Sequence, residues 1–94
     1  MLKAEYKVEG GKLIKVQLAK KGNTIDKIKI TGDFFLHPEE TIEKIEGSLV
    51  RRILNEAELA NLIRTVIEKN EATLLGASPE DFAKCIIMAS EKND

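Results

Sequence analysis

The spacing of the apolar residues changes near residue 32, and this change restricts the fold more than any other feature of the sequence. Before Gly32, apolar and polar residues alternate, which is the period of a half-buried β-strand. After Pro38, apolar residues recur every three or four positions, which is the period of an amphipathic α-helix. The sequence therefore predicts an α+β domain, with strands over about residues 2–32 and helices over about residues 38–92.

Two turn signals divide the first part of the chain into three strands. Gly10-Gly11 and Gly22-Asn23 suit tight turns because Gly and Asn tolerate positive φ angles. Short turns join antiparallel neighbours, so we expect a three-stranded antiparallel meander. One face of this sheet is expected to be rich in Lys. The other is expected to be apolar and to carry Leu2, Ala4, Tyr6, Val8, Ile14, Val16, Leu18, Ile28 and Ile30.

Three helices are expected after the strands. Pro38 suits the first position of a helix, and Asn55 and Ser78 (followed by Pro79) are N-cap residues for a second and a third. Residues 74–77 are expected to connect these last two helices. The expected apolar faces are Ile42, Ile45, Leu49 and Ile53, then Leu59, Leu62, Ile63, Val66 and Ile67, then Phe82, Cys85, Ile86 and Ala89. We therefore expect one domain over residues 1–94, with about three helices packed on one face of the sheet.

The charge of the chain is unevenly distributed. Residues 1–32 hold eight Lys against three acids, whereas residues 33–94 hold seven Lys or Arg against thirteen acids. This asymmetry suits docking to a charged partner, and it equally suits two solvated faces. A single Cys excludes an intramolecular disulfide and favours a reducing cytoplasm, and no apolar run approaches the roughly 20 residues of a membrane span.

The residue types that mark most catalytic and metal sites are missing. Lys12 follows two glycines as in a phosphate loop, but Leu13 stands where that loop needs Ser or Thr. His37 is the only histidine, so a zinc site of the usual composition is not expected, and His37 itself is expected to face solvent. Cys85 lies on an apolar helix face and is expected to be buried. We expect no catalytic residue and no metal site in this chain.

Residues 30–40 stand apart because two of the three phenylalanines are adjacent at the junction of strand and helix. If the strand alternation persists, Phe34 points into the core and Phe35 points out. An exposed aromatic ring beside Asp33 is a candidate anchor for a partner protein. The alternative is that both rings close the end of the core.

Three segments resemble the C-terminal accessory domain of lipoate–protein ligases. They are Ile30-Thr31-Gly32-Asp33-Phe34-Phe35-Leu36 with Pro38-Glu39-Glu40, the hairpin Tyr6-Lys7-Val8-x-Gly10-Gly11-Lys12-Leu13-Ile14, and Leu74-Leu75-Gly76-Ala77-Ser78-Pro79-Glu80-Asp81-Phe82. The first is moderately specific, and the order and spacing of all three extend the resemblance over nearly the whole chain.

This resemblance implies a function that the residues alone do not. In that family a larger catalytic domain binds lipoate and ATP with Mg, forms lipoyl-adenylate and transfers the lipoyl group to acceptor proteins. The sequence begins with Met1 and is too short for the catalytic domain, so it resembles the form in which the accessory domain is a separate chain. The resemblance implies a cytoplasmic, non-catalytic subunit that forms a heterodimer with a catalytic subunit, is required for adenylate formation, and binds no cofactor alone.

The resemblance also directs attention to candidate contact residues. Lys12, in the first hairpin, is the first candidate for a polar contact with the partner. Asp33 and Phe35, at the junction of strand and helix, are the second, with Gly32 allowing close approach.

Two other classes of function remain as alternatives. An iron–sulfur scaffold needs about three Cys ligands, and a sulfur acceptor needs an exposed thiol, whereas this chain has one Cys on an apolar face. A nucleic-acid-binding module could use the Lys-rich sheet face, but single-strand binders place aromatic residues among their basic ones. None is expected on that face, so neither nucleic acid nor membrane is an expected partner.

Overall fold

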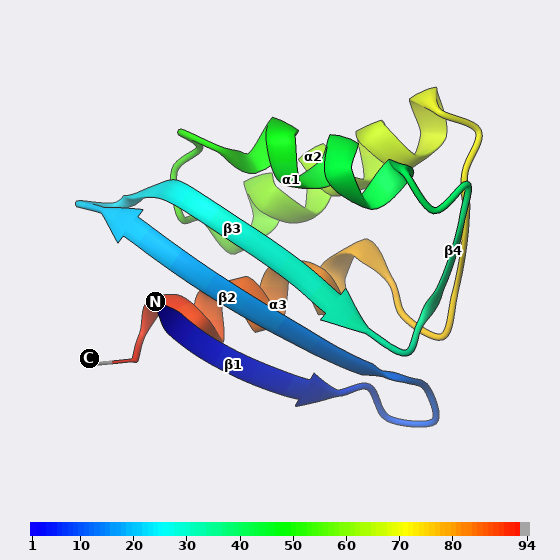
Figure 1. Ribbon diagram of the computed structural model, residues 1–94, viewed down its shortest axis with the longest axis horizontal. Helices are drawn as coiled ribbons and strands as arrows, with labels where there is room; N and C mark the ends of the chain where they lie inside the picture. Colours follow the sequence, from blue (N-terminus) through cyan, green and yellow to red (C-terminus); the bar gives the residue numbers. More distant parts are fainter. Residues whose placement is uncertain (93–94) are drawn as a thin grey trace.

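A computed structural model describes residues 1–92 and shows the expected α+β architecture. In chain order the elements are β1 (Leu2–Lys7), β2 (Leu13–Lys21), β3 (Thr24–Gly32), β4 (Phe35–His37), α1 (Thr41–Leu49), α2 (Glu56–Lys69), β5 (Thr73–Leu75) and α3 (Pro79–Ser90). The three long strands form one layer and the helices cover one of its faces (Figure 1).

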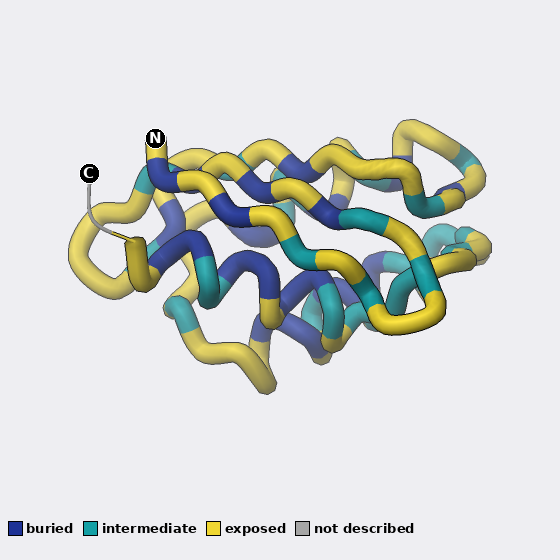
Figure 2. Tube along the Cα trace, turned by 90° about the horizontal axis from the view of Figure 1, so that it is seen from below, coloured by how far each residue is buried: buried dark blue, intermediate teal, exposed yellow. Residues whose placement is uncertain are grey.

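The main sheet is the predicted meander in the order β1-β2-β3, with both pairs antiparallel. Its register places apolar residues opposite one another, as in the pairs Ala4–Val16 and Val16–Ile30. The strands alternate between buried and exposed positions, which Figure 2 shows as dark blue and yellow along the trace. A register shift between Ala19 and Lys20 is the one irregularity of this sheet.

The core lies between the sheet and the helices. Helix α3 packs on β1 and β2, α1 packs on β3, and α2 packs on both other helices. The largest fully buried side chain of the core is Phe82 of α3. The other fully buried apolar side chains are Ile14, Val16, Leu18, Ile25, Ile45, Leu49, Leu59, Ile63, Ala83, Cys85, Ile86 and Ala89.

The predicted N-caps of the second and third helices are confirmed. The Asn55 side chain accepts a hydrogen bond from the Glu58 amide at 3.0 Å. Ser78 and Asp81 form a reciprocal capping box, in which the Ser78 hydroxyl accepts from the Asp81 amide and the Asp81 carboxylate accepts from the Ser78 amide. These bonds satisfy amides that the first turn of a helix leaves unpaired.

The first helix begins later than the sequence predicted. Residues from Pro38 form a preceding turn, in which the Thr41 amide donates to the Pro38 carbonyl at 3.0 Å. Helix α1 starts at Thr41, with Glu40 as its N-cap. The third helix also ends earlier than expected, at Ser90.

The prediction that Ile53 shares the apolar face of the first helix is wrong. Helix α1 ends at Leu49, because Val50 takes extended backbone angles. Ile53 lies beyond this end, is 55% exposed, and forms an isolated β-bridge with Thr24. The helical spacing of Ile53 is therefore coincidental.

The sequence did not predict a second, two-stranded sheet. Residues 74–77 were expected to be only a connection, yet β5 pairs antiparallel with β4, with Phe35 opposite Leu75 and His37 opposite Thr73. Strands of three residues are too short to show an alternating pattern. This β4–β5 ribbon runs along one end of the molecule (Figure 1).

A candidate docking surface at the corner of the sheet

The tip of the β1–β2 hairpin packs against the connection between β5 and α3. The Lys12 amide donates a hydrogen bond to the Gly76 carbonyl at 2.9 Å. Contact is so close that a Cβ atom on Gly11 would lie 2.4 Å from this carbonyl oxygen. A Cβ atom on Gly76 would lie 2.5 Å from Cγ of Lys12. The hairpin is thus positioned by a segment that follows it by more than sixty residues.

The junction between β3 and β4 is bound to the start of β2. Asp33 donates its amide to the Leu13 carbonyl at 3.2 Å, and its carboxylate accepts from the Leu13 amide at 2.7 Å. Gly32 precedes it with a φ of +155°, and a Cβ atom there would lie 2.2 Å from the Leu13 carbonyl oxygen. The close approach that Gly32 allows in this structure is therefore to its own chain.

The two adjacent phenylalanines point in opposite directions, as the alternation predicted. Phe34 is partly buried and meets Phe82 edge to face, with 4.9 Å between ring centroids. Phe35 is 52% exposed and stacks on His37, whose exposure is confirmed. Opposite Phe35 on the β4–β5 ribbon, Leu75 is 58% exposed. Phe35 and Leu75 thus form an apolar pair on the surface of this ribbon.

All four residues predicted from the sequence lie at this end of the sheet. Together with Leu75 they form what is hereafter called the corner surface: Lys12, Gly32, Asp33, Phe35 and Leu75. Bonds from Lys12 to Gly76 and from Leu13 to Asp33 connect the hairpin, the β3–β4 junction and the β4–β5 ribbon. Leu75 was not predicted to belong to this surface. The sequence signal that could have indicated it is the apolar pair Leu74-Leu75 directly before Gly76, in the third of the resembling segments.

A shallow hollow of about 320 Å³ adjoins the corner surface. It is lined by residues of β3, β4 and the start of α1: Ile30, Thr31, Gly32, Phe34, Phe35, Leu36, His37, Glu39 and Ile42. The hollow is open and has a mixed polar and apolar lining, which suits a side chain of a partner protein better than an enclosed small molecule.

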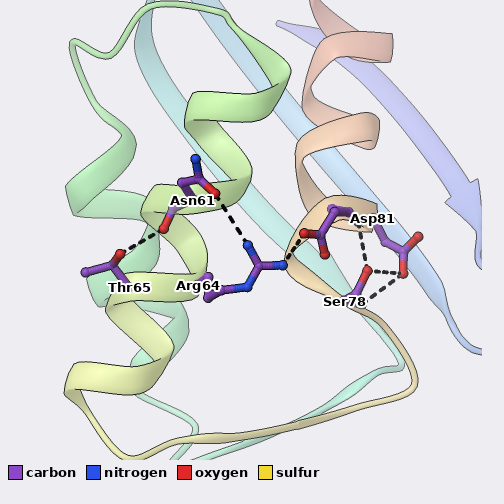
Figure 3. A network of polar contacts seen from close by, with 6 residues as sticks. Asn61, Arg64, Thr65, Ser78 and Asp81 are labelled. Carbon is purple, nitrogen blue, oxygen red and sulfur yellow. Dashed lines mark hydrogen bonds and ion pairs between the residues drawn. The ribbon is translucent and has the colours of Figure 1, made fainter.

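Contacts between helices α2 and α3 fix the start of α3, which follows the segment that packs on the hairpin. Figure 3 shows Arg64 of α2 reaching the first turn of α3, where its guanidinium bonds the Glu80 carboxylate. This hydrogen bond is the main reason why the pKa of Glu80 is lowered from its ordinary value. The neighbouring Ser78–Asp81 capping box fixes the start of α3, directly after the Gly76-Ala77 segment that contacts the hairpin.

Cys85 is buried, as predicted, and its environment opposes thiol chemistry. Its Sγ donates to the carbonyls of Ala4 and Ile14, each at 3.7 Å. Burial, with a smaller effect of the Glu5 charge, raises the pKa of this thiol to about 11. A sulfur acceptor needs an accessible thiolate, so this environment argues against that class of function.

Two kinds of feature are absent among the described residues. Within residues 1–92 no three His, Cys, Asp or Glu side chains gather closely enough to hold a metal ion. None of the helices in that range is long and apolar enough to cross a membrane. An exposed aromatic and aliphatic pair beside charged residues is the composition of a protein-binding site.

Comparison with known proteins identifies the family. A family model described as the bacterial lipoate protein ligase C-terminus matches residues 1–86. The chain is 35% identical over 86 residues to lipoate-protein ligase A subunit 2 of Thermoplasma acidophilum, covering 92% of this chain and 87% of that protein.

A solved structure agrees with this assignment. It comes from a structural analysis of an archaeal lipoylation system, a bi-partite lipoate protein ligase and its E2 lipoyl domain from T. acidophilum. One of its chains matches with a TM-score of 0.77 and 32% identity, over 92% of this chain and 94% of that chain. On the strength of both the sequence and the fold, this chain belongs to the family of lipoate–protein ligase C-terminal domains.

Proposed function

We propose that this chain is the non-catalytic accessory subunit of a two-chain lipoate–protein ligase. The observation that carries the proposal is the 35% identity over 87% of a protein that is itself a ligase subunit. In the proposed assembly a catalytic subunit binds lipoate, ATP and Mg, and forms lipoyl-adenylate only when this chain is bound. The lipoyl group then passes to acceptor proteins. The heterodimer is proposed to act in the cytoplasm, and this chain binds no cofactor alone.

The corner surface is the proposed contact with the catalytic subunit. Phe35 and Leu75 supply apolar area that is exposed in the isolated chain, and aromatic residues dominate the binding energy of many interfaces. Lys12 supplies a positive charge at the rim, where charges mainly affect orientation and association rate. Gly32 and Asp33 act indirectly, since they hold the β3–β4 junction against Leu13.

The proposed effect on catalysis is positional. In adenylate formation the carboxylate of lipoate attacks the α-phosphorus of ATP, the bond between the α- and β-phosphates breaks, and pyrophosphate leaves. Water can compete in this step or hydrolyse its product, so loops that close over the nucleotide favour it. Holding the reacting groups in place lowers the barrier because translational and rotational freedom is already lost. We propose that the accessory chain orders such loops in its partner, whereas transfer from preformed lipoyl-adenylate proceeds without it.

A reconstituted assay tests both parts of this proposal. Adenylate formation is measured with the catalytic subunit alone and with this chain added, and transfer is measured separately from preformed lipoyl-adenylate. We expect adenylation only in the mixture and transfer in both samples. Equal adenylation in both samples, with no complex on gel filtration, would exclude the accessory role.

Variants then locate the contact. Phe35→Ser and Leu75→Ser are expected to weaken the complex by roughly tenfold or more each, since apolar anchors at the centre of interfaces contribute most of the affinity. Both side chains are more than half exposed, so the fold is expected to survive, as circular dichroism would show. Lys27→Ser on the outer sheet face is the matched surface control for the complex. Unchanged affinity in both variants would place the contact elsewhere.

A further inference from the structure

The loop between α1 and α2 forms a second unusual surface. Residues 51–54 lie along the start of β3 and the tip of the β2–β3 hairpin. The Arg51 amide donates to the Ile25 carbonyl at 2.7 Å, and the Arg52 carbonyl accepts from the Ile25 amide at 3.0 Å. The Leu54 amide donates to the Asn23 carbonyl at 2.9 Å. The loop backbone is therefore fixed, and its side chains are presented from a rigid base.

Arg51 holds a backbone conformation that disfavours its side chain. Its φ is +72°, which glycine adopts freely and which other residues adopt only with strain. Within residues 1–92 neither Arg51 nor Arg52 is within ion-pair distance of a carboxylate. The only hydrogen bond of either guanidinium in that range is from Nε of Arg52 to the Ser48 carbonyl at 3.3 Å. The fold thus gains nothing evident from arginine at position 51.

These two arginines border a second hollow on the described surface. It measures about 500 Å³ and lies between the loop and the outward side of α2. Its lining is Arg51, Arg52, Ile53, Glu58, Leu59, Asn61, Leu62 and Thr65. Glu58 is the one acidic residue among them, and its carboxylate is not within ion-pair distance of either arginine. Ile53 is 55% exposed, and Val50, the C-cap residue of α1 directly before the loop, is 36% exposed. Arginine is enriched at the energetic centres of interfaces, whereas lysine, the common residue of the outer sheet face, is depleted at interfaces.

This hollow lies at the opposite end of the molecule from the corner surface. In Figure 1 the α1–α2 loop and the β2–β3 turn lie at one end of the long axis, which measures 33 Å, and the β4–β5 ribbon lies at the other. Within residues 1–92, the exposed large apolar residues other than Met1 lie at these two ends: Phe35 and Leu75 at one, Val50 and Ile53 at the other. A stable interface engages about 20–30 residues on each side, far more than the corner surface provides.

We propose that the Arg51–Arg52 hollow is a second docking site for the catalytic ligase subunit. It would receive a segment in which a carboxylate stands beside an aliphatic side chain, because the site offers two guanidinium groups that have no ion-pair partner within residues 1–92, beside the exposed side chain of Ile53. This inference rests on the proposed function, since it names a further contact in the same assembly. It explains the retained strain, because arginine at position 51 serves binding at the expense of stability.

Two glycine substitutions separate binding from stability. Arg51→Gly relieves the positive φ and is expected to raise the melting temperature by about 4 °C, and to weaken binding to the purified catalytic subunit by at least about tenfold. Glu71→Gly is the matched control. Glu71 also has a positive φ, +50°, in the turn after α2, so the same rise in melting temperature is expected without loss of affinity.

A second pair of variants tests the charge itself by isothermal titration calorimetry with the catalytic subunit. Arg52→Gln is expected to weaken the complex, whereas Lys29→Gln on the outer sheet face is expected to leave it unchanged. If Arg51→Gly and Arg52→Gln both bind as tightly as the wild type, the second site is overturned while the accessory role stands. If the wild type forms no complex, both proposals fail. The inference is also overturned if Arg51→Gly and Arg52→Gln abolish only self-association of this chain, or only binding to the acceptor protein, and leave binding to the catalytic subunit unchanged.

Discussion

Replacement of Gly32 by alanine tests whether the corner is built as described. The added Cβ would lie 2.2 Å from the Leu13 carbonyl oxygen and 2.9 Å from the Phe34 ring. The backbone oxygen cannot move aside without the strand that carries it. Relief therefore requires the β3–β4 junction to separate from β2, where the two Asp33–Leu13 hydrogen bonds join them.

These contacts set the loss of stability that is expected for Gly32→Ala. A non-glycine residue at a positive φ costs about 1–3 kcal/mol. The two hydrogen bonds contribute about 1 kcal/mol each, and both weaken when the junction moves. The free energy of unfolding should therefore fall by about 3 kcal/mol, out of a total of about 5–15 kcal/mol for a domain of this size. This corresponds to a melting temperature lower by roughly 12 °C or more.

Urea denaturation of Gly32→Ala measures this loss, with Gly47→Ala as the control. Gly47 lies within α1, and a Cβ atom there would have no neighbour within 4 Å, so alanine should stabilise the helix by about 1 kcal/mol. Opposite signs for the two variants are expected. A Gly32→Ala protein within about 0.5 kcal/mol of the wild type would refute the close contact with Leu13, because surface substitutions without special contacts fall in that range.

Other predictions follow from the caps, the ion pair and the buried thiol. Ser78→Ala removes the capping box of α3 and should lower the free energy of unfolding by about 1 kcal/mol in urea melts, and no change would contradict the cap. The Glu80 pKa, followed by NMR, should return towards its ordinary value in Arg64→Ala; any stabilisation from this pair is present above the ordinary carboxyl pKa and is lost as pH falls through the lowered value. Cys85 should react with a thiol reagent only when the protein unfolds, and rapid labelling of the native state would contradict its burial. Because the pKa of Cys85 is raised from 9.0 to about 11, stability should fall between these two pH values as the unfolded thiol ionises first.

The parts of the fold that the sequence predicted correctly are those governed by local rules. Alternation placed the three long strands and the opposite directions of Phe34 and Phe35, because side chains of a strand alternate between its faces. The caps at Asn55 and Ser78 follow from side-chain bonding to amides only three residues away.

The parts that escaped prediction depend on contacts between distant residues. Leu75 becomes a surface residue of the corner because β5 pairs with β4, and neither strand is long enough to show its period. Ile53 matched the spacing of α1 but is held by a bridge to Thr24. The positive φ of Arg51 arises where the loop bonds to Ile25, and arginine itself gives no signal of such a conformation. Asp33 and Phe35 were candidates from the strand alternation as well as from the resemblance, Lys12 and Gly32 were candidates from the resemblance, and all four remain predictions as partner contacts.

The β4–β5 ribbon has a consequence for how a partner would affect the whole domain. It joins Phe35 to Leu75, so the chain that forms α1 and α2 leaves the sheet and returns to the same place. A protein that grips both side chains at once would act as a non-covalent cross-link at the base of this closed loop. If α1 and α2 unfolded while the partner stayed bound, the chain between Phe35 and Leu75 would remain a closed loop with reduced conformational entropy. Unfolding of these helices would therefore be less favourable than in the free chain. Binding of the partner at the β4–β5 ribbon would thus stabilise α1 and α2 against unfolding, although the packing of these helices does not change.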